Sequence, residues 1–244
     1  MTADLARRAS AEFAGTGLLV TAVVGSGIAA ARLSPHDVGL QLLENAIATA
    51  LALGALILMF GPVSGAHFNP VVSAVDWWLG RRGGNGLTAT HLGGYVVAQV
   101  AGAAAGAVLA DVMFGLPAVA WSQTRRTGGH LWLAEVVATA GLVVLIFALS
   151  RSDRTSVAPA AVGAYIGAAY WFTSSTSFAN PAVTIGRVFS DTFAGIAPAS
   201  APGFVVAQLV GGLVAAGALA WWYPTADRTA ADIVIPRARQ EVGT

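Results

Sequence analysis

Residues 64–71 read Ser-Gly-Ala-His-Phe-Asn-Pro-Val, and residues 177–182 read Ser-Phe-Ala-Asn-Pro-Ala. The chain has four asparagines, and two of them, Asn69 and Asn180, precede a proline in these stretches. Asparagine is favoured at a helix N-cap and proline in the first turn, so each Asn-Pro box predicts a helix start with free backbone N–H groups and a positive dipole end. At membrane depth, two such starts facing each other across a pore would orient neutral solutes and repel cations.

The composition of the chain indicates an integral membrane protein of one domain. Of its 244 residues, 56% are hydrophobic and only 10% are charged, and the mean hydropathy is +0.69. A soluble domain carries about a quarter charged residues. The absence of cysteine excludes disulfides, thiolate metal sites and cysteine nucleophiles. A net charge of +1 argues against a basic surface for nucleic acid.

Six apolar segments, each near the roughly 20 residues that a bilayer core requires, predict spanning helices. The first follows Arg7 and Arg8 and lacks a small-residue cleavage site, so we interpret it as a span and not as a removed signal. Two shorter apolar segments, 69–79 and 180–189, begin with the Asn-Pro boxes and predict half-helices that enter the membrane and stop. The expected spans are 10–31, 40–61, 86–110, 130–149, 156–174 and 202–223.

The positive residues, all arginines, predict the orientation of these spans. Nine of the thirteen lie on one side if both termini are cytoplasmic, as the positive-inside rule expects. The channel domain then covers residues 1–224, and residues 225–244 form a cytoplasmic tail. The nine are Arg7, Arg8, Arg81, Arg82, Arg151, Arg154, Arg228, Arg237 and Arg239, against Arg32, Arg125, Arg126 and Arg187 outside.

The two halves of the chain, about 10–110 and 130–223, repeat each other. Residues 95–100 read Tyr-Val-Val-Ala-Gln-Val and residues 204–209 read Phe-Val-Val-Ala-Gln-Leu, and an Ala-Glu pair recurs at Glu12 and Glu135. Three spans in each half require the second copy to be inverted. Inverted repeats place their shared site at the midplane, where the broken helices meet.

These residues resemble the major intrinsic protein family, the aquaporins and glyceroporins, over about residues 10–223. The resemblance implies an all-α membrane protein with six transmembrane helices and two re-entrant half-helices. It also implies one pore per subunit, a homotetramer in the plasma or inner membrane, and passage of water and small neutral solutes. Neither a cofactor nor a metal is expected. An enzyme is not expected either, since the sequence shows no nucleophile–base constellation.

The resemblance assigns roles to residues of both halves. Glu12 and Glu135 would accept hydrogen bonds from the loops before the boxes, and His67 would brace the first loop. Val71 stands where the family usually has alanine. If its extra bulk closes the pore, the protein would be an adhesion or scaffold protein and not a channel. The implied central constriction consists of Asn69, Pro70, Val71, Asn180, Pro181 and Ala182.

The sequence departs from the family pattern at the outer constriction. Members that pass water or glycerol usually have arginine directly after the second box, whereas this chain has Val183. Matched by spacing, the other filter positions would be Thr49, Ala168 and Ser177, so no ring and no fixed charge is expected. Arg187 is a vestibule candidate, but pairing with Asp191, one turn on, is favoured.

A wide mouth without arginine predicts a passive channel that favours glycerol or neutral metalloid acids, such as arsenite and organoarsenicals, over strict water selectivity. One alternative is a water-selective aquaporin. Another is an energy-coupled secondary transporter, which also uses inverted repeats and broken helices. The transporter would need acidic residues at the breaks, where this chain has asparagine and hydroxyl groups.

Overall fold

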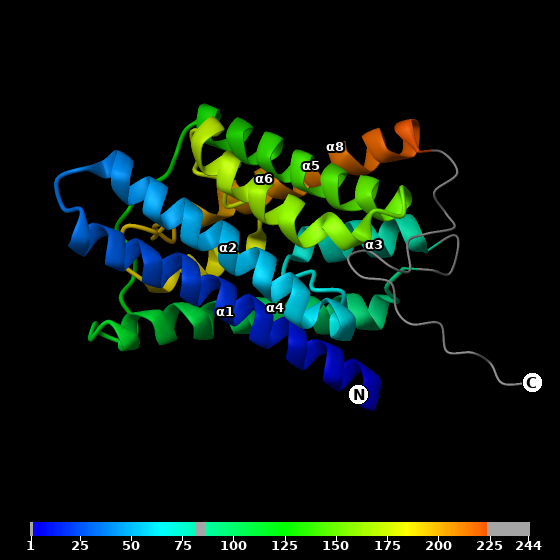
Figure 1. Ribbon diagram of the computed structural model, residues 1–244, viewed down its shortest axis with the longest axis horizontal. Coiled ribbons are helices and arrows are strands. Elements are labelled where there is room, and N and C mark those ends of the chain that lie inside the picture. Colours follow the sequence, from blue (N-terminus) through cyan, green and yellow to red (C-terminus); the bar gives the residue numbers. More distant parts are fainter. Residues whose placement is uncertain (1, 82–85, 224–244) are drawn as a thin grey trace, which may run out of the picture.

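The computed structural model describes residues 2–81 and 86–223, and the predicted tail at 225–244 lies outside the described residues. Within these ranges the chain is helical and has no strand (Figure 1). The helices are α1 (Ala3–Leu33), α2 (Val38–Ser64), α3 (Pro70–Gly80), α4 (Ala89–Met113), α5 (Gly129–Arg151), α6 (Ala158–Phe172), α7 (Pro181–Gly186) and α8 (Ala201–Trp222), with 3₁₀ turns η1 (Thr155–Val157) and η2 (Arg187–Phe189).

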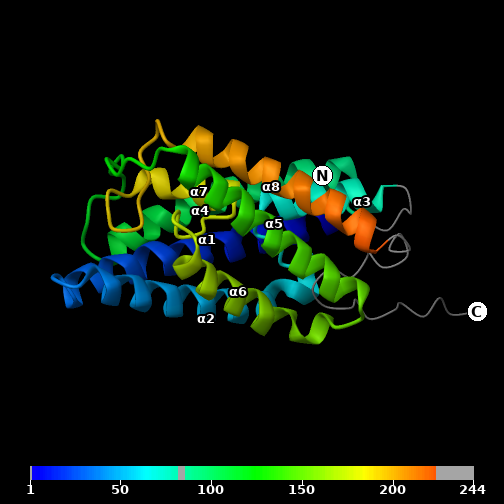
Figure 2. The ribbon, with the colours of Figure 1, turned by 90° about the horizontal axis from the view of Figure 1, so that it is seen from above.

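The predicted fold class, six long helices with two half-helices, is confirmed. Five helices (α1, α2, α4, α5 and α8) are long and apolar enough to cross a membrane. The sixth, α6, has 15 residues and is about 22 Å long at 1.5 Å per residue; η1 precedes it directly. The half-helices α3 and α7 lie toward opposite ends of the bundle (Figure 2), and η2 continues α7 to Phe189.

Glycines permit close contacts between helices of the bundle. A Cβ atom on Gly102 of α4 would lie 2.2 Å from the carbonyl oxygen of Phe13 in α1. In the second half, a Cβ atom on Gly211 of α8 would lie 2.7 Å from the carbonyl oxygen of Val136 in α5. Neither helix pair tolerates a larger residue there, which is how small residues bring membrane helices together.

Each half-helix packs against a long helix of the other half. A Cβ atom on Gly186 of α7 would lie 2.6 Å from the carbonyl oxygen of Ala103 in α4, and one on Gly212 of α8 would lie 2.5 Å from Cγ1 of Val71 in α3. The two halves therefore interlock around the two boxes, and the extra bulk of Val71 is accommodated beside a glycine.

Candidate functional site

Both half-helices begin as the Asn-Pro boxes predict. The Asn69 side chain caps α3 by accepting a hydrogen bond from the backbone N–H of Val71 at 2.9 Å. The Asn180 side chain caps α7 by accepting from Ala182 at 2.9 Å and from Val183 at 3.3 Å. A proline occupies the first helical position in each case, where its missing N–H costs nothing.

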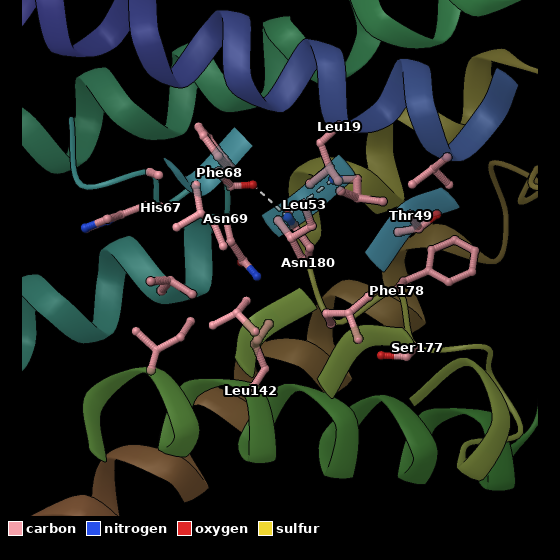
Figure 3. Close-up of a pocket in the computed structure, with 18 of the residues that line it drawn as sticks. Leu19, Thr49, Leu53, His67, Phe68, Asn69, Leu142, Ser177, Phe178 and Asn180 are labelled. Atoms are coloured by element: carbon pink, nitrogen blue, oxygen red, sulfur yellow. Dashed lines mark hydrogen bonds between the residues drawn. The ribbon is translucent and has the colours of Figure 1, made fainter. Parts of the chain in front are cut away.

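The two asparagines also join the halves to each other. Asn69 Nδ2 donates to the carbonyl oxygen of Ala179 at 2.7 Å. Asn180 Nδ2 donates to the carbonyl oxygen of Phe68 at 2.7 Å (Figure 3). An amide NH₂ group has two donors. Among the residues that the structure describes, one N–H of each asparagine is therefore left over, and both asparagines line the same cavity.

The loops before the boxes have a repeated, strained backbone. Ala66 and Phe68 have φ 50°, and in the second loop Ser177 and Ala179 have φ 50° and 49°. Residues other than glycine rarely adopt this left-handed backbone conformation, which costs of the order of 1 kcal/mol per residue or more. The same alternation at the same distance before each asparagine shows that the repeat extends to the backbone.

A buried glutamate holds the first loop in this conformation. Glu12 accepts hydrogen bonds from Ser64 Oγ at 2.6 Å and from the backbone N–H groups of His67 and Phe68 at 3.0 and 2.7 Å. Gln99 Nε2 donates to the same carboxylate at 2.8 Å. These four donors supply the partners that a carboxylate away from water requires.

The second half repeats this arrangement. Glu135 accepts from the backbone N–H groups of Phe178 and Ala179 at 2.9 and 2.8 Å, and from Gln208 Nε2 at 2.7 Å. Gln208 also donates to Thr184 Oγ1 at 2.8 Å, on α7. The structure thus places both predicted glutamates against the loops.

His67 lies beside the first half-helix. Its Nδ1 is 3.0 Å from Ser73 Oγ, and its ring lies edge-on to Tyr95 with the centroids 5.4 Å apart. His67 also lines the cavity. Its position suits the bracing role implied by the resemblance.

The cavity has a volume of about 60 Å³ and runs between the two boxes. Figure 3 shows His67 toward one end and Thr49 and Ser177 toward the other, with the two asparagines between them; we call the second end the Thr49 end. Most of the wall is aliphatic. The polar lining residues are His67, Asn69, Asn180, Thr49, Tyr170, Ser177 and Arg187.

The Thr49 end corrects one sequence-based expectation. Of the four residues expected at the filter, Thr49, Ser177 and Val183 line the cavity, whereas Ala168 is exposed on the outside of α6 and Tyr170 lines the cavity instead. Two residues along a helix correspond to a rotation of about 200°, so Ala168, the position counted from the box, lies on the face of α6 opposite to Tyr170. The expectation of a ring-free end is therefore wrong, since Tyr170 and Phe178 both contribute rings.

Hydroxyl groups gather at this end. Thr49 Oγ1 lies 3.2 Å from the Tyr170 hydroxyl. Ser177 Oγ is buried, and no residue in the described ranges hydrogen-bonds to it. A cavity-lining hydroxyl without a protein partner is available to a polar solute.

Arg187 does not make the favoured pair with Asp191. It is 2% exposed and lines the cavity, its guanidinium carbon lies 3.4 Å from the centroid of the Phe178 ring, and its Nε donates to the carbonyl oxygen of Ala194. Asp191 instead accepts from the backbone N–H of Gln123 at 2.8 Å. The ring and the carbonyl hold the guanidinium in place, the ring through a cation–π contact.

Arg126, to which sequence reasoning assigned no role at the pore, also lies close to the Phe178 ring. Its Nε donates to the carbonyl oxygen of Gly195 at 2.9 Å and its backbone N–H donates to Ser200 Oγ at 3.0 Å. Its guanidinium carbon is 5.3 Å from the Phe178 centroid. Burial lowers the pKa of the Arg126 guanidinium from its ordinary value. Arg126 is not among the residues that line the cavity.

The sequence and the fold of this chain are similar to those of known proteins. A profile described as Major intrinsic protein matches residues 1–177. Aquaglyceroporin AqpS of Rhizobium meliloti is 53% identical over 89% of this chain and 91% of its own length. Aquaporin AqpM of Methanothermobacter marburgensis is 30% identical over 92% and 99%. The X-ray structure of the aquaglyceroporin from Plasmodium falciparum covers 91% of this chain and 99% of its own with a TM-score of 0.67 at 21% identity.

Proposed function

The chain belongs to the major intrinsic protein family, and from that premise we propose that it forms a passive channel for small uncharged, hydroxylated solutes. Glycerol and neutral metalloid acids, such as arsenite and organoarsenicals, are favoured over strict water selectivity. The proposal rests chiefly on the meeting of Asn69 and Asn180 at the cavity, each with one amide N–H left over. Two fixed donors facing a cavity can hold a neutral solute as it passes.

The lining of the cavity supports the preference for solutes larger than water. Leucine, isoleucine and valine make up half of the residues that line it, while hydroxyl groups gather at the Thr49 end. A polyol or a hydroxylated acid presents hydroxyl groups along with an apolar or weakly hydrated face, and such a wall suits both. The position after the second box is held by Val183 and not by a long charged side chain. The relative AqpS is itself described as an aquaglyceroporin.

The proposal extends to the orientation, the membrane and the oligomeric state of the channel. We propose that both termini are cytoplasmic, so that the Thr49 end opens outward, and that the protein resides in the plasma or inner membrane. A homotetramer is proposed from the family resemblance. The channel domain is proposed to cover residues 1–224.

Stopped-flow light scattering on proteoliposomes tests the proposal by comparing water, glycerol and neutral arsenite for the native protein and for Val183→Arg. The native protein is expected to pass all three, with flux linear in the gradient and independent of ion gradients. The added arginine is expected to suppress glycerol and arsenite more than water. Native vesicles that pass only water would support a water-selective aquaporin, and flux driven by an ion gradient would support a transporter.

A further inference from the structure

We propose that Arg187 supplies the positive charge and the strong hydrogen-bond donor of the Thr49 end, in place of a charged residue directly after the second box. The inference rests on the proposed channel function and names the residue that keeps cations out of it. It differs from the expectation drawn from the sequence, which paired Arg187 with Asp191 and left the end without a fixed charge.

The position of the guanidinium carries the first step. Arg187 follows α7 directly, four residues beyond Val183, or about 6 Å along a helix axis. Its side chain nevertheless lines the same cavity as Val183, stacked face-on over the Phe178 ring. The charge therefore borders the path of a solute without occupying the position of Val183, and the small side chain there leaves room beside it.

The bonding of the guanidinium carries the second step. An arginine side chain has five N–H donors, and Nε–H donates to the Ala194 carbonyl oxygen. Within residues 2–81 and 86–223, Arg187 forms no ion pair, and no acceptor binds its terminal nitrogens. A buried charge is normally paired. The terminal N–H donors of Arg187, which have no partner among the described residues, therefore remain for the cavity.

No carboxylate in the described ranges lies within ion-pair distance of the Arg187 guanidinium. Glu135 is committed to the loop N–H groups of Phe178 and Ala179 and to Gln208, and Asp191 is held by the backbone of Gln123. A single positive charge in a narrow, weakly polarisable passage repels cations strongly, whereas a neutral hydroxylated solute accepts hydrogen bonds from it. The hydroxyl groups of Thr49 and Ser177 complete such a binding end.

Arg126 provides a matched control. It also approaches Phe178, but its guanidinium donates to the loop carbonyls of Gly195 and Phe193, and it does not line the cavity. Removing Arg126 therefore changes the charge of the same region without changing the charge that a solute meets.

The test is a cation leak assay combined with glycerol flux on the same proteoliposomes. Arg187→Met is expected to raise the passive leak of protons and Na⁺ by about tenfold or more over the native protein, while glycerol flux remains measurable. Arg126→Met is expected to leave the leak at the native level. Two further variants are expected to show no cation leak above the native level. Arg187→Lys keeps a positive charge at the same residue, and the double variant Arg187→Met with Val183→Arg moves the charge to residue 183.

The outcomes separate the two proposals. Native vesicles without glycerol flux would overturn the channel function itself. Arg187→Met vesicles that conduct glycerol and stay tight to cations would overturn only the role of Arg187, as would an equal leak in Arg126→Met. If Arg187→Met does not conduct, Arg187→Gln takes its place with the same expected leak. Loss of glycerol flux in every Arg187 variant, lysine included, would mark a structural residue and also overturn the assignment.

Discussion

The first and second broken helices are built alike at the backbone and differ in the side chains they turn toward the cavity. Both have a strained loop, an asparagine cap and a glutamate behind the loop. Yet Ala66 in the first loop corresponds to Ser177 in the second, and His67 corresponds to Phe178. The repeated parts build the pore, and the parts that differ make its two ends chemically unlike.

The sharpest difference falls seven residues after each asparagine. In the first half that residue is Asp76, which is buried, accepts a hydrogen bond from the backbone N–H of Leu87 at 2.8 Å and does not line the cavity. In the second half it is Arg187, which does line the cavity. The same repeat position thus holds a loop in one half and lines the cavity in the other. Symmetry of the sequence does not imply symmetry of function.

Removing either glutamate is expected to have the largest effect, and a similar one in both halves. Glu12→Ala and Glu135→Ala each leave two buried loop N–H groups without an acceptor, at about 1–3 kcal/mol each, so the free energy of unfolding falls by about 2–6 kcal/mol. Thermal unfolding in detergent measures this. Glu44→Ala is the control, because Glu44 is half-buried and, within the described part of the chain, accepts a hydrogen bond only from Ser34 Oγ. A large loss of stability in only one of the two variants would show that the two loops are not stabilised in the same way.

The general plan of the fold could be predicted because it depends on local and repeated signals. Apolar length predicted the spans, and the Asn-Pro boxes predicted the starts of α3 and α7 at the residues where they begin. The glutamates at corresponding repeat positions were expected behind the loops, where the structure places them. Each of these features can be read within one segment or by comparing one half with the other.

The details of the Thr49 end could not be predicted, because they depend on contacts between segments. Whether Ala168 or Tyr170 faces the cavity depends on the rotation of α6 and on the loop after it. The direction of Arg187 depends on Phe178 and on the Ala194 carbonyl, which only the folded loops bring together. An aromatic residue near the end of a span was the one available signal for Tyr170.

Replacing the asparagines is expected to have an intermediate effect on flux. Asn69→Ala and Asn180→Ala each remove one bond between the halves and one free donor at the cavity. Loss of about 1 kcal/mol of solute stabilisation lowers glycerol flux about fivefold. Asn180→Ala should be the more severe, because Asn180 caps two N–H groups and Asn69 caps one.

Asn45→Ala serves as the control for both asparagine variants. Asn45 is equally buried and donates to the Val23 carbonyl oxygen and to Ser26 Oγ, but it does not line the cavity. Its replacement is expected to lower stability and to leave the flux per folded channel unchanged. Flux that falls equally in all three variants would assign the asparagines a structural role only.

The smallest effect on flux is expected at the residue where the first box departs from the family pattern. Val71 packs against Gly212 and does not line the cavity, whereas its neighbour Val72 does. Val71→Ala should therefore cost about 1 kcal/mol of stability through a small void and leave glycerol flux unchanged, while Val72→Ala should widen the path and raise it. The two substitutions remove the same atoms one residue apart. Stopped-flow flux per channel therefore distinguishes a loss of packing, which leaves the flux unchanged, from a widening of the pore, which raises it. A rise in flux with Val71→Ala alone would mean that Val71 restricts the pore, and that the first half, and not only the second, sets what passes.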